Sequence, residues 1–227
     1  MTNVYVVVEG KSEQAFVQQV LAVDFANRDI CLEAVLVGKP GHKGGNRWPV
    51  ARTDIVNLLK MGRPHRRVCV TTMFDYYAMP VEWPGRSTVA TLAREERAAS
   101  VEMAIAADIA SAFDDGFDPA RFVPYVQIHE FETLIFADPG RLSEEFPDRA
   151  DQIAQLVASV AGIAPEDIND TPAGAPSKRI IDKIPEYASR KSSAGPDILK
   201  LAGLPTLSAR CPHFALWLAR MESLATQ

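Results

Sequence analysis

The sequence predicts an α/β protein, with a mostly parallel four-stranded central sheet followed by a helical C-terminal layer. In residues 1–135, short continuous apolar runs alternate with segments whose apolar residues recur at helical spacing. In residues 136–227 the helical spacing continues and no further strand is indicated. Parallel neighbours in a sheet need crossover connections, which helices between the strands supply. We therefore expect an α/β core and a helical region packed on it, divided at residue 135.

Four segments are predicted as strands because each is a short apolar run that a sheet covered on both faces would bury. They are residues 3–8, 30–37, 67–74 and 122–128. The first run ends at Glu9 and Gly10 and passes directly into a helical pattern. The chain is therefore expected to open with a strand-turn-helix unit.

Helices are predicted where apolar residues fall three or four positions apart. These segments are 12–27, 49–61 and 87–113 in the core, and 133–146, 149–161, 177–188, 194–202 and 210–224 in the helical region. Pro and Gly residues within 162–176 mark the best internal boundary, but no low-complexity linker separates two autonomous domains. The helical region is therefore expected to dock on the sheet.

Composition excludes several classes of protein. The chain has 227 residues and is 47% hydrophobic, which is enough for a sizeable core. Its net charge of −5 argues against bulk attraction to nucleic acid, so such a partner would have to meet local basic patches. The three cysteines lack disulfide or zinc-knuckle spacing, which indicates buried free thiols in a reducing compartment. With no leader pattern and no membrane-length apolar run, we expect a cytoplasmic protein without a membrane partner.

Carboxylates follow three of the predicted strands. They lie in Val-Glu-Gly-Lys-Ser-Glu (8–13), Met-Phe-Asp-Tyr-Tyr (73–77) and His-Glu-Phe-Glu (129–132). The ends of parallel strands share one edge of a sheet, and anionic groups gathered there repel one another unless a cation lies among them. The sequence therefore predicts a divalent-metal site at this edge.

Glu9 ends the first strand and Glu13 follows one helical turn later, so both side chains can reach the same point above the sheet edge. Considered alone, Glu13 is better explained as an acid that complements the positive end of its helix. Asp75 follows the third strand, where a carboxylate would present a metal ligand, although an aspartate can also begin a turn toward Pro80. Tyr77 stands where a second acid would extend the ligand set.

Glu130 and Glu132 are two positions apart, so they would face the same way in an extended segment and diverge in a helix. We expect one of the two to be structural. His129 could be a ligand or a general base, but we favour a hydrogen-bonded histidine beneath the helical layer. The segment is not the His-Glu-x-x-His zinc motif.

Gly10-Lys11-Ser12 after a strand invites comparison with the phosphate-binding P-loop, but that loop needs a glycine where this chain has Tyr5. Basic residues elsewhere are candidates for gripping phosphate, although such loops are often only solvated turns. They are Lys39, His42, Lys43 and Arg47 in a glycine-rich loop, and Lys178 and Arg179 after Pro176. The candidate contacts to phosphate or nucleic acid are Lys11, Lys43, Arg47 and Arg179.

The acidic segments resemble the Toprim (topoisomerase-primase) fold, in which a glutamate follows the first strand in a Val-Glu-Gly context and an aspartate follows the third. Val-Glu-Gly-Lys-Ser-Glu is especially similar to Toprim domains of OLD-family nucleases (overcoming lysogenization defect), which use a second glutamate four residues later. With Asp-Tyr-Tyr, His-Glu-Phe-Glu, Ala-Pro-Ser-Lys-Arg and Cys-Pro-His-Phe, the chain more closely resembles a bacterial Toprim-like family known mainly as a domain of unknown function. This resemblance spans nearly the whole chain, whereas the general Toprim resemblance covers residues 1–135.

The resemblance implies a Rossmann-like Toprim sheet that holds Mg²⁺ or Mn²⁺ and acts in phosphodiester cleavage or transfer. Glu9 would be the first metal ligand or the acid/base, Glu13 a partner ligand and Asp75 the central ligand. Glu130 and Glu132 would be candidates for a second metal. The catalytic set would be completed by Lys178, which would stabilise the charged phosphate.

Three functions stay open on the sequence. The first is a nuclease subunit that cuts DNA in preference to RNA, in genome defence or repair, with two ions about 4 Å apart. By analogy with OLD proteins, a separate ABC-type ATPase would be its partner. The second is a noncatalytic subunit that binds an ATPase or nucleic acid, which Tyr77 favours because Toprim enzymes usually have a second aspartate there. The third is chemistry on a small phosphate ester, and an oligomer is possible with each.

Overall fold

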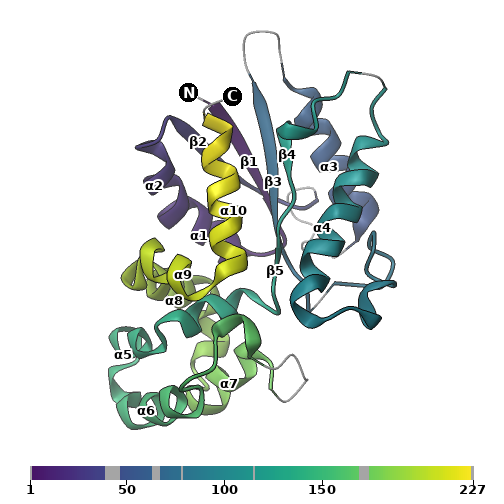
Figure 1. Ribbon diagram of the computed structural model, residues 1–227. Helices are drawn as coiled ribbons and strands as arrows, with labels where there is room; N and C mark the ends of the chain where they lie inside the picture. The colour runs from purple at the N-terminus through teal and green to yellow at the C-terminus, as the bar shows by residue number, and fades with distance from the viewer. Residues whose placement is uncertain are drawn as a thin grey trace.

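The structure is a computed structural model that describes residues 2–38, 47–62, 67–77, 79–114, 116–168 and 174–225. A parallel sheet runs through its centre (Figure 1). The strands are β1 (Thr2–Val8), β2 (Ile30–Leu36), β3 (Val68–Asp75), β4 (Phe122–Val123) and β5 (Val126–Gln127). The order is β2-β1-β3-β4, with β5 also paired to β3, and every pair is parallel. The predicted α/β class and parallel sheet are confirmed.

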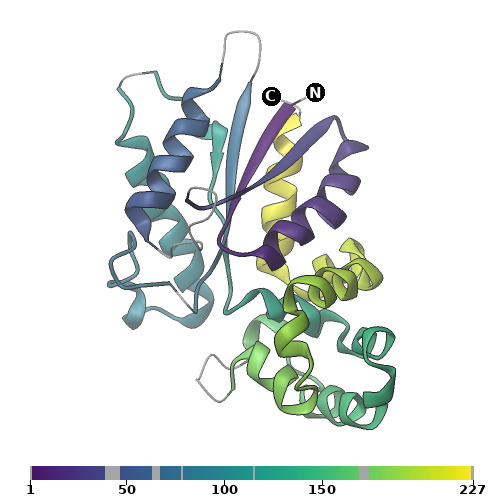
Figure 2. The same ribbon diagram turned by 180° about the vertical axis from the view of Figure 1, so that it is seen from behind.

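Helices cover both faces of the sheet. Their bounds are α1 (Lys11–Phe16), a π turn (Val17–Leu21), α2 (Ala22–Ala26), α3 (Trp48–Lys60), α4 (Arg94–Ala110), α5 (Leu142–Glu145), α6 (Ala150–Ser159), α7 (Pro176–Lys183), α8 (Tyr187–Ala202), α9 (Leu204–Arg210) and α10 (Pro212–Glu222). Figures 1 and 2 show α3 and α4 on one face, α1, α2 and α10 on the other, and α5 to α9 beyond the carboxyl ends of the strands. Met73 and Phe74, neighbours in β3, are buried in the two separate cores that result.

The predicted fourth strand, residues 122–128, is interrupted at Pro124 and Tyr125. Pro124 has no N–H to donate to a neighbouring strand. Thr72 bridges the interruption, because its Oγ1 accepts a hydrogen bond from Tyr125 N and donates one to Tyr125 O, both at 2.8 Å. The sheet therefore has five strands where four are expected.

The helix predicted at residues 87–113 begins only at Arg94. Leu92 and Ala93 before it are extended, and Arg97 Nε donates to Leu92 O at 3.1 Å. The side chain of Arg97 thereby satisfies a carbonyl that a longer helix would have paired with the backbone.

Two predictions in the helical region were also wrong in extent. The segment 133–146 is a 3₁₀ helix at Phe131–Ala137, a second short turn and α5, because Pro139 cannot continue the helix. Helix α8 begins at Tyr187, before the predicted start at residue 194, and continues through Pro196. Packing rather than helix propensity holds this helix, since Pro196 and its neighbour Gly195 are both buried.

Helix α10 returns from the helical region to the sheet. Trp217 Nε1 donates to Thr71 Oγ1 at 2.7 Å, and the Trp217 ring stacks on Tyr125 with centroids 4.3 Å apart. Just beyond the helix, Thr2 Oγ1 donates to Leu224 O at 3.4 Å, and the two ends of the chain lie side by side (Figures 1 and 2). The division of the chain at residue 135 stays a prediction.

The three cysteines are free, and Cys69 and Cys211 are buried as expected. Cys31 is exposed, against the expectation, because β2 is an edge strand whose first residues alternate between buried and exposed. Within the described ranges, no helix is long and apolar enough to cross a membrane.

Candidate metal centre

The strands β1, β3 and β5 end at one edge of the sheet, the lower edge in Figure 1. Glu9 follows β1, Asp75 closes β3, and Glu132 lies in the 3₁₀ helix after β5. The backbone N–H of Asp75 lowers the pKa of Glu9, and the backbone N–H of Phe131 lowers the pKa of Asp75, although burial outweighs both effects. The three acidic segments predicted from the sequence therefore meet.

The acids at this edge act on one another electrostatically. Burial, reinforced by the charge of Glu13, raises the pKa of Glu9 from 4.5 to about 8. Burial also raises the pKa of Asp75 well above its ordinary value, and the charges of Glu13, Glu9 and Glu132 raise it further. We call Glu9, Glu13, Asp75 and Glu132 the carboxylate cluster.

Two oxygen atoms of the cluster lack a partner. Glu9 Oε1 and Asp75 Oδ1 are buried and accept no hydrogen bond from the described part of the chain. Buried polar atoms are almost always paired, because desolvation without a compensating contact is costly. These two oxygen atoms are therefore suited to a cation or to a proton.

Glu13 folds back over the start of its own helix. The backbone N–H groups of Glu13 and Gly10 lower the pKa of this carboxyl group, but burial outweighs them and raises it to about 6. A Cβ at position 10 would lie 2.7 Å from Glu13 Oε2, so this position of the carboxylate requires glycine. The positive end of the helix thus accounts for part, but not all, of the environment of Glu13.

Glu132 has partners on α8. Lys191 Nζ lies 3.1 Å from Glu132 Oε1, and Tyr187 Oη donates to the same oxygen at 3.4 Å. Burial raises the pKa of Glu132, and the charge of Lys191 opposes that rise. The charge of Lys191 also lowers the pKa of Glu13, so this ammonium group acts on acids of both α1 and the 3₁₀ helix.

The structure distinguishes Glu130 from Glu132. Glu130 Oε2 accepts a hydrogen bond from Ser177 N at 2.9 Å, and its side chain also caps the 3₁₀ helix at Thr133. Glu130 therefore holds the starts of two helices, which is the structural role expected for one member of the pair. Whether it also binds a metal ion stays a prediction.

The described basic candidates lie at the starts of helices α1, α3 and α7. Lys11 is exposed at the start of α1, Arg47 is exposed directly before α3, and Lys178 is exposed in the first turn of α7. Arg179 Nε donates to Gly174 O at 2.9 Å, which fixes the entry to α7. Lys43, like Lys39 and His42, lies outside the described residues.

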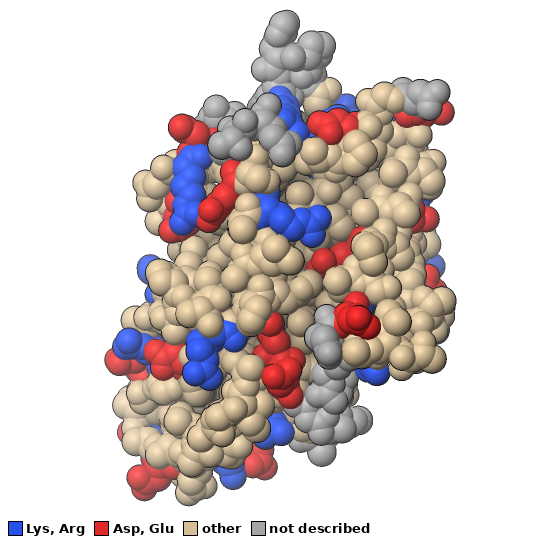
Figure 3. Space-filling model, viewed as in Figure 1, with Lys and Arg blue, Asp and Glu red and all other residues tan. Residues whose placement is uncertain are grey.

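Charges of both signs share the molecular surface. On the face seen in Figure 3, the described Lys and Arg side chains are interspersed with Asp and Glu and form no continuous basic patch. This distribution agrees with the acidic net charge of −5. Bulk attraction therefore does not explain binding to nucleic acid at this face.

Sequence reasoning missed Lys191 and Tyr187. Lys191 falls between the predicted helices 177–188 and 194–202, and no motif surrounds it. The only available signal was a lysine within a largely helical region, which is too common to be selective.

The donor set fits one hard cation better than a closed metal cage. In the described ranges, no three Asp, Glu, His or Cys side chains are placed to hold one ion. Magnesium, however, is usually bound through one or two carboxylates, with water and substrate phosphate completing its shell. Glu9 and Asp75, each with an unpaired buried oxygen, are the two carboxylates that could hold such an ion.

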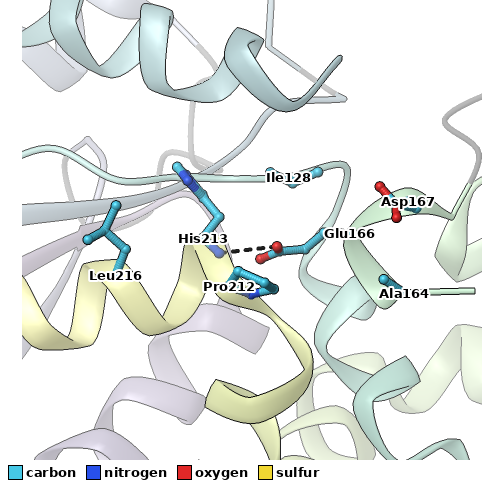
Figure 4. A pocket seen from close by; sticks show the side chains of 7 residues that line it. All are labelled: Ile128, Ala164, Glu166, Asp167, Pro212, His213 and Leu216. Carbon is cyan, nitrogen blue, oxygen red and sulfur yellow. Dashed lines mark hydrogen bonds between the residues drawn. The ribbon is translucent and has the colours of Figure 1, made fainter. Parts of the chain in front are cut away.

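A separate pocket of about 380 Å³ lies where the residue after β5 meets the start of α10 (Figure 4). Its lining residues are Ile128, Ala164, Glu166, Asp167, Pro212, His213 and Leu216. Glu166 accepts hydrogen bonds from the backbone N–H groups of His213 (3.1 Å) and Phe214 (3.2 Å) and so caps α10. His129 Nε2 lies 3.0 Å from Glu166 O, which confirms the expected hydrogen-bonded histidine.

The fold and the carboxylate cluster define an α/β protein with buried acids at the carboxyl edge of a parallel sheet. Residues 8–222 match the model of a family described as a domain of unknown function (DUF4276), and the chain belongs to that family. That description names no activity and gives no link to Toprim domains or OLD nucleases. No curated protein matches the chain, and no solved structure does.

Proposed function

We propose that this protein is a Toprim-like, divalent-metal-dependent phosphodiesterase that cleaves nucleic acid. The proposal rests on one observation above all: two strand ends bring Glu9 and Asp75 together with buried, unpaired oxygen atoms among further acids. Buried like charges are unfavourable without a compensating cation. A site that keeps several carboxylates buried together is therefore a candidate for binding a functional cation.

Glu9 and Asp75 would hold Mg²⁺ or Mn²⁺ at the sheet edge. The ion, when bound, supplies a Lewis acid for a phosphoryl oxygen and an acidified water molecule. Glu9 keeps a proton near neutral pH in the metal-free protein, with a pKa of about 8, so it would either release that proton to bind the ion or act as the acid/base. Glu13 would support the ligands, and Lys178, exposed on α7, would approach the phosphate.

The partners belong to the same proposal. Nucleic acid, DNA in preference to RNA, would approach the carboxyl edge of the sheet, with Lys11, Arg47 and Arg179 as the described candidates for contact. An ABC-type ATPase would be a separate partner, by analogy with OLD proteins only. The expected site of action is the cytoplasm.

The test is cleavage of labelled DNA and RNA by the purified protein, with and without Mg²⁺ or Mn²⁺, for the wild type, Glu9→Gln and Asp75→Asn. Loss of a group that only orients a metal ligand reduces activity about 10- to 100-fold. We expect either substitution, which removes a ligand itself, to reduce metal-dependent cleavage by more than that. Each change keeps the size of the side chain, and circular dichroism would verify the fold.

Exposed acids provide matched controls. Glu33→Gln on β2 and Asp151→Asn on α6 alter the same functional groups at exposed positions. Both should cleave like the wild type. Cleavage that persists undiminished in Glu9→Gln and Asp75→Asn would refute the proposed site.

A noncatalytic subunit is the second candidate. Tyr77 in place of an acid, and the described residues' lack of a three-ligand group, favour it. In that case a partner ATPase or nucleic acid would bind tightly. Calorimetry would detect no binding of metal ions to the wild type, and Glu9→Gln would not change the result.

A further inference from the structure

The carboxylate cluster is neutralised unevenly. The side chain of Lys191 forms an ion pair with one member of the cluster, with Nζ 3.1 Å from Glu132 Oε1. Tyr187 Oη, also on α8, donates to the same oxygen at 3.4 Å. The Glu132 end of the cluster is therefore already supplied with a positive charge and a hydrogen-bond donor.

At Glu9 and Asp75, one oxygen of each carboxylate remains unpaired within the described residues. Glu9 Oε1 and Asp75 Oδ1 are buried, and no described residue donates a hydrogen bond to them. Within the described residues, Glu132 therefore has a cation as a partner. Glu9 and Asp75 have no such partner among those residues, so a further cation would bind between these two side chains.

We propose that the cluster holds a single divalent ion, between Glu9 and Asp75, and that the ammonium group of Lys191 takes the place of a second cation beside Glu132. This inference rests on the proposed metal-dependent function and changes the two-ion arrangement expected from the sequence. It also assigns Lys191 a role in setting how many ions the site accepts.

The distances give the physical reason. An ion coordinated by Glu132 Oε1 would lie about 2.1 Å from that oxygen. Since Lys191 Nζ is 3.1 Å from the same oxygen, the ion and the ammonium group would be no more than about 5 Å apart. Like charges at that separation in a buried site repel each other, and Glu132 is already paired with the ammonium group, so Lys191 disfavours a second ion at Glu132.

The experiment counts bound Mn²⁺ per chain by electron paramagnetic resonance of the free ion, in the absence of nucleic acid. We expect one Mn²⁺ per chain for the wild type and two for Lys191→Met, because Glu132 then lacks its counter-charge. Lys191→Arg keeps the charge and should bind one. Lys200→Met, at an exposed position of the same helix, is the control and should also bind one.

The outcomes separate this inference from the proposed function. Two bound ions on the wild type would contradict the role of Lys191 but not the metal site. The same would follow if Lys191→Met bound a single ion while unfolding at the same temperature as the wild type. No bound Mn²⁺ on the wild type would overturn the proposed metal site and this inference with it. Should Lys191→Met fold poorly, a second ion on Lys191→Gln provides the same test.

Discussion

At the scale of single residues, burial and like charge set the behaviour of the carboxylate cluster. Glu9 and Glu13 both have a pKa above the ordinary 4.5, at about 8 and about 6. Burial is the larger cause for each, and a neighbouring acid adds to it. The folded protein therefore keeps protons that the unfolded chain releases.

This difference predicts how stability depends on pH. Between pH 4.5 and about 8, the folded state binds more protons at Glu9 than the unfolded state does, so the free energy of unfolding falls as pH rises. The same sign holds for Glu13 between 4.5 and about 6. Thermal unfolding without divalent ions should therefore show a midpoint that declines across this window.

Glu9→Gln isolates the contribution of Glu9. The substitution removes one titrating group, so the decline above pH 6 should become shallower, whereas in Glu33→Gln it should keep the wild-type slope. Added Mn²⁺ should raise the midpoint of the wild type more at pH 8 than at pH 5, because protons and the ion compete for the same oxygens. A midpoint that rises with pH in metal-free protein would contradict the assignment.

At the scale of secondary structure, helix α8 supplies the polar partners of Glu132 and packs closely against the 3₁₀ helix. A Cβ at Gly195 would lie 3.0 Å from Phe131 Cε1 and 3.2 Å from Tyr187 Oη. Glycine at this position allows the close approach that brings α8 to Glu132. Tertiary packing therefore explains the glycine at this position, since glycine in the middle of a helix is otherwise unfavourable.

Gly195→Ala should destabilise the protein despite the better helix propensity of alanine. Alanine gains about 1 kcal/mol from propensity, but overpacking of a well-packed core costs about 1–3 kcal/mol. We expect a net loss of about 1 kcal/mol in urea unfolding. Ser193→Ala, exposed on the same helix, should change stability by less than about 0.5 kcal/mol. A more stable Gly195→Ala variant would contradict this prediction, because it would show that Phe131 and Tyr187 move aside at little energetic cost.

At the scale of the whole molecule, α10 joins the C-terminal region to the sheet. Trp217 is buried, stacks on Tyr125 and donates to Thr71 in β3. Arg28, after α2, forms an ion pair with Glu222 at the end of α10. Helix α10, near the end of the chain, therefore helps to cover one face of the sheet that β1 belongs to.

Trp217→Phe should lower the free energy of unfolding of the molecule as a whole. The change leaves a gap in the core and removes a buried hydrogen bond, together costing about 1–3 kcal/mol. Urea unfolding followed by circular dichroism should show one transition, shifted to lower urea. Leu216→Ala, at a neighbouring exposed position, should shift it little. Two separate transitions in Trp217→Phe would instead support independent units.

The strands were predicted almost to the residue where burial is greatest. The runs 3–8 and 67–74 correspond to β1 at Thr2–Val8 and β3 at Val68–Asp75, because strands covered on both faces read as continuous apolar runs. The interruption at Pro124 and the late start of α4 were missed. Both depend on side chains, Thr72 and Arg97, that replace backbone hydrogen bonds.

The sequence by itself determined that acids follow the predicted strands, and from a parallel sheet it predicted that the three acidic segments share an edge. Only the tertiary structure decided which acid has a partner. Glu130 binds the start of α7, Glu132 meets Lys191 and Tyr187, and Glu9 and Asp75 retain unpaired oxygens. Those partners lie far away in sequence, and close packing of α8 on α1 and the 3₁₀ helix, which no local pattern encodes, brings them to the cluster.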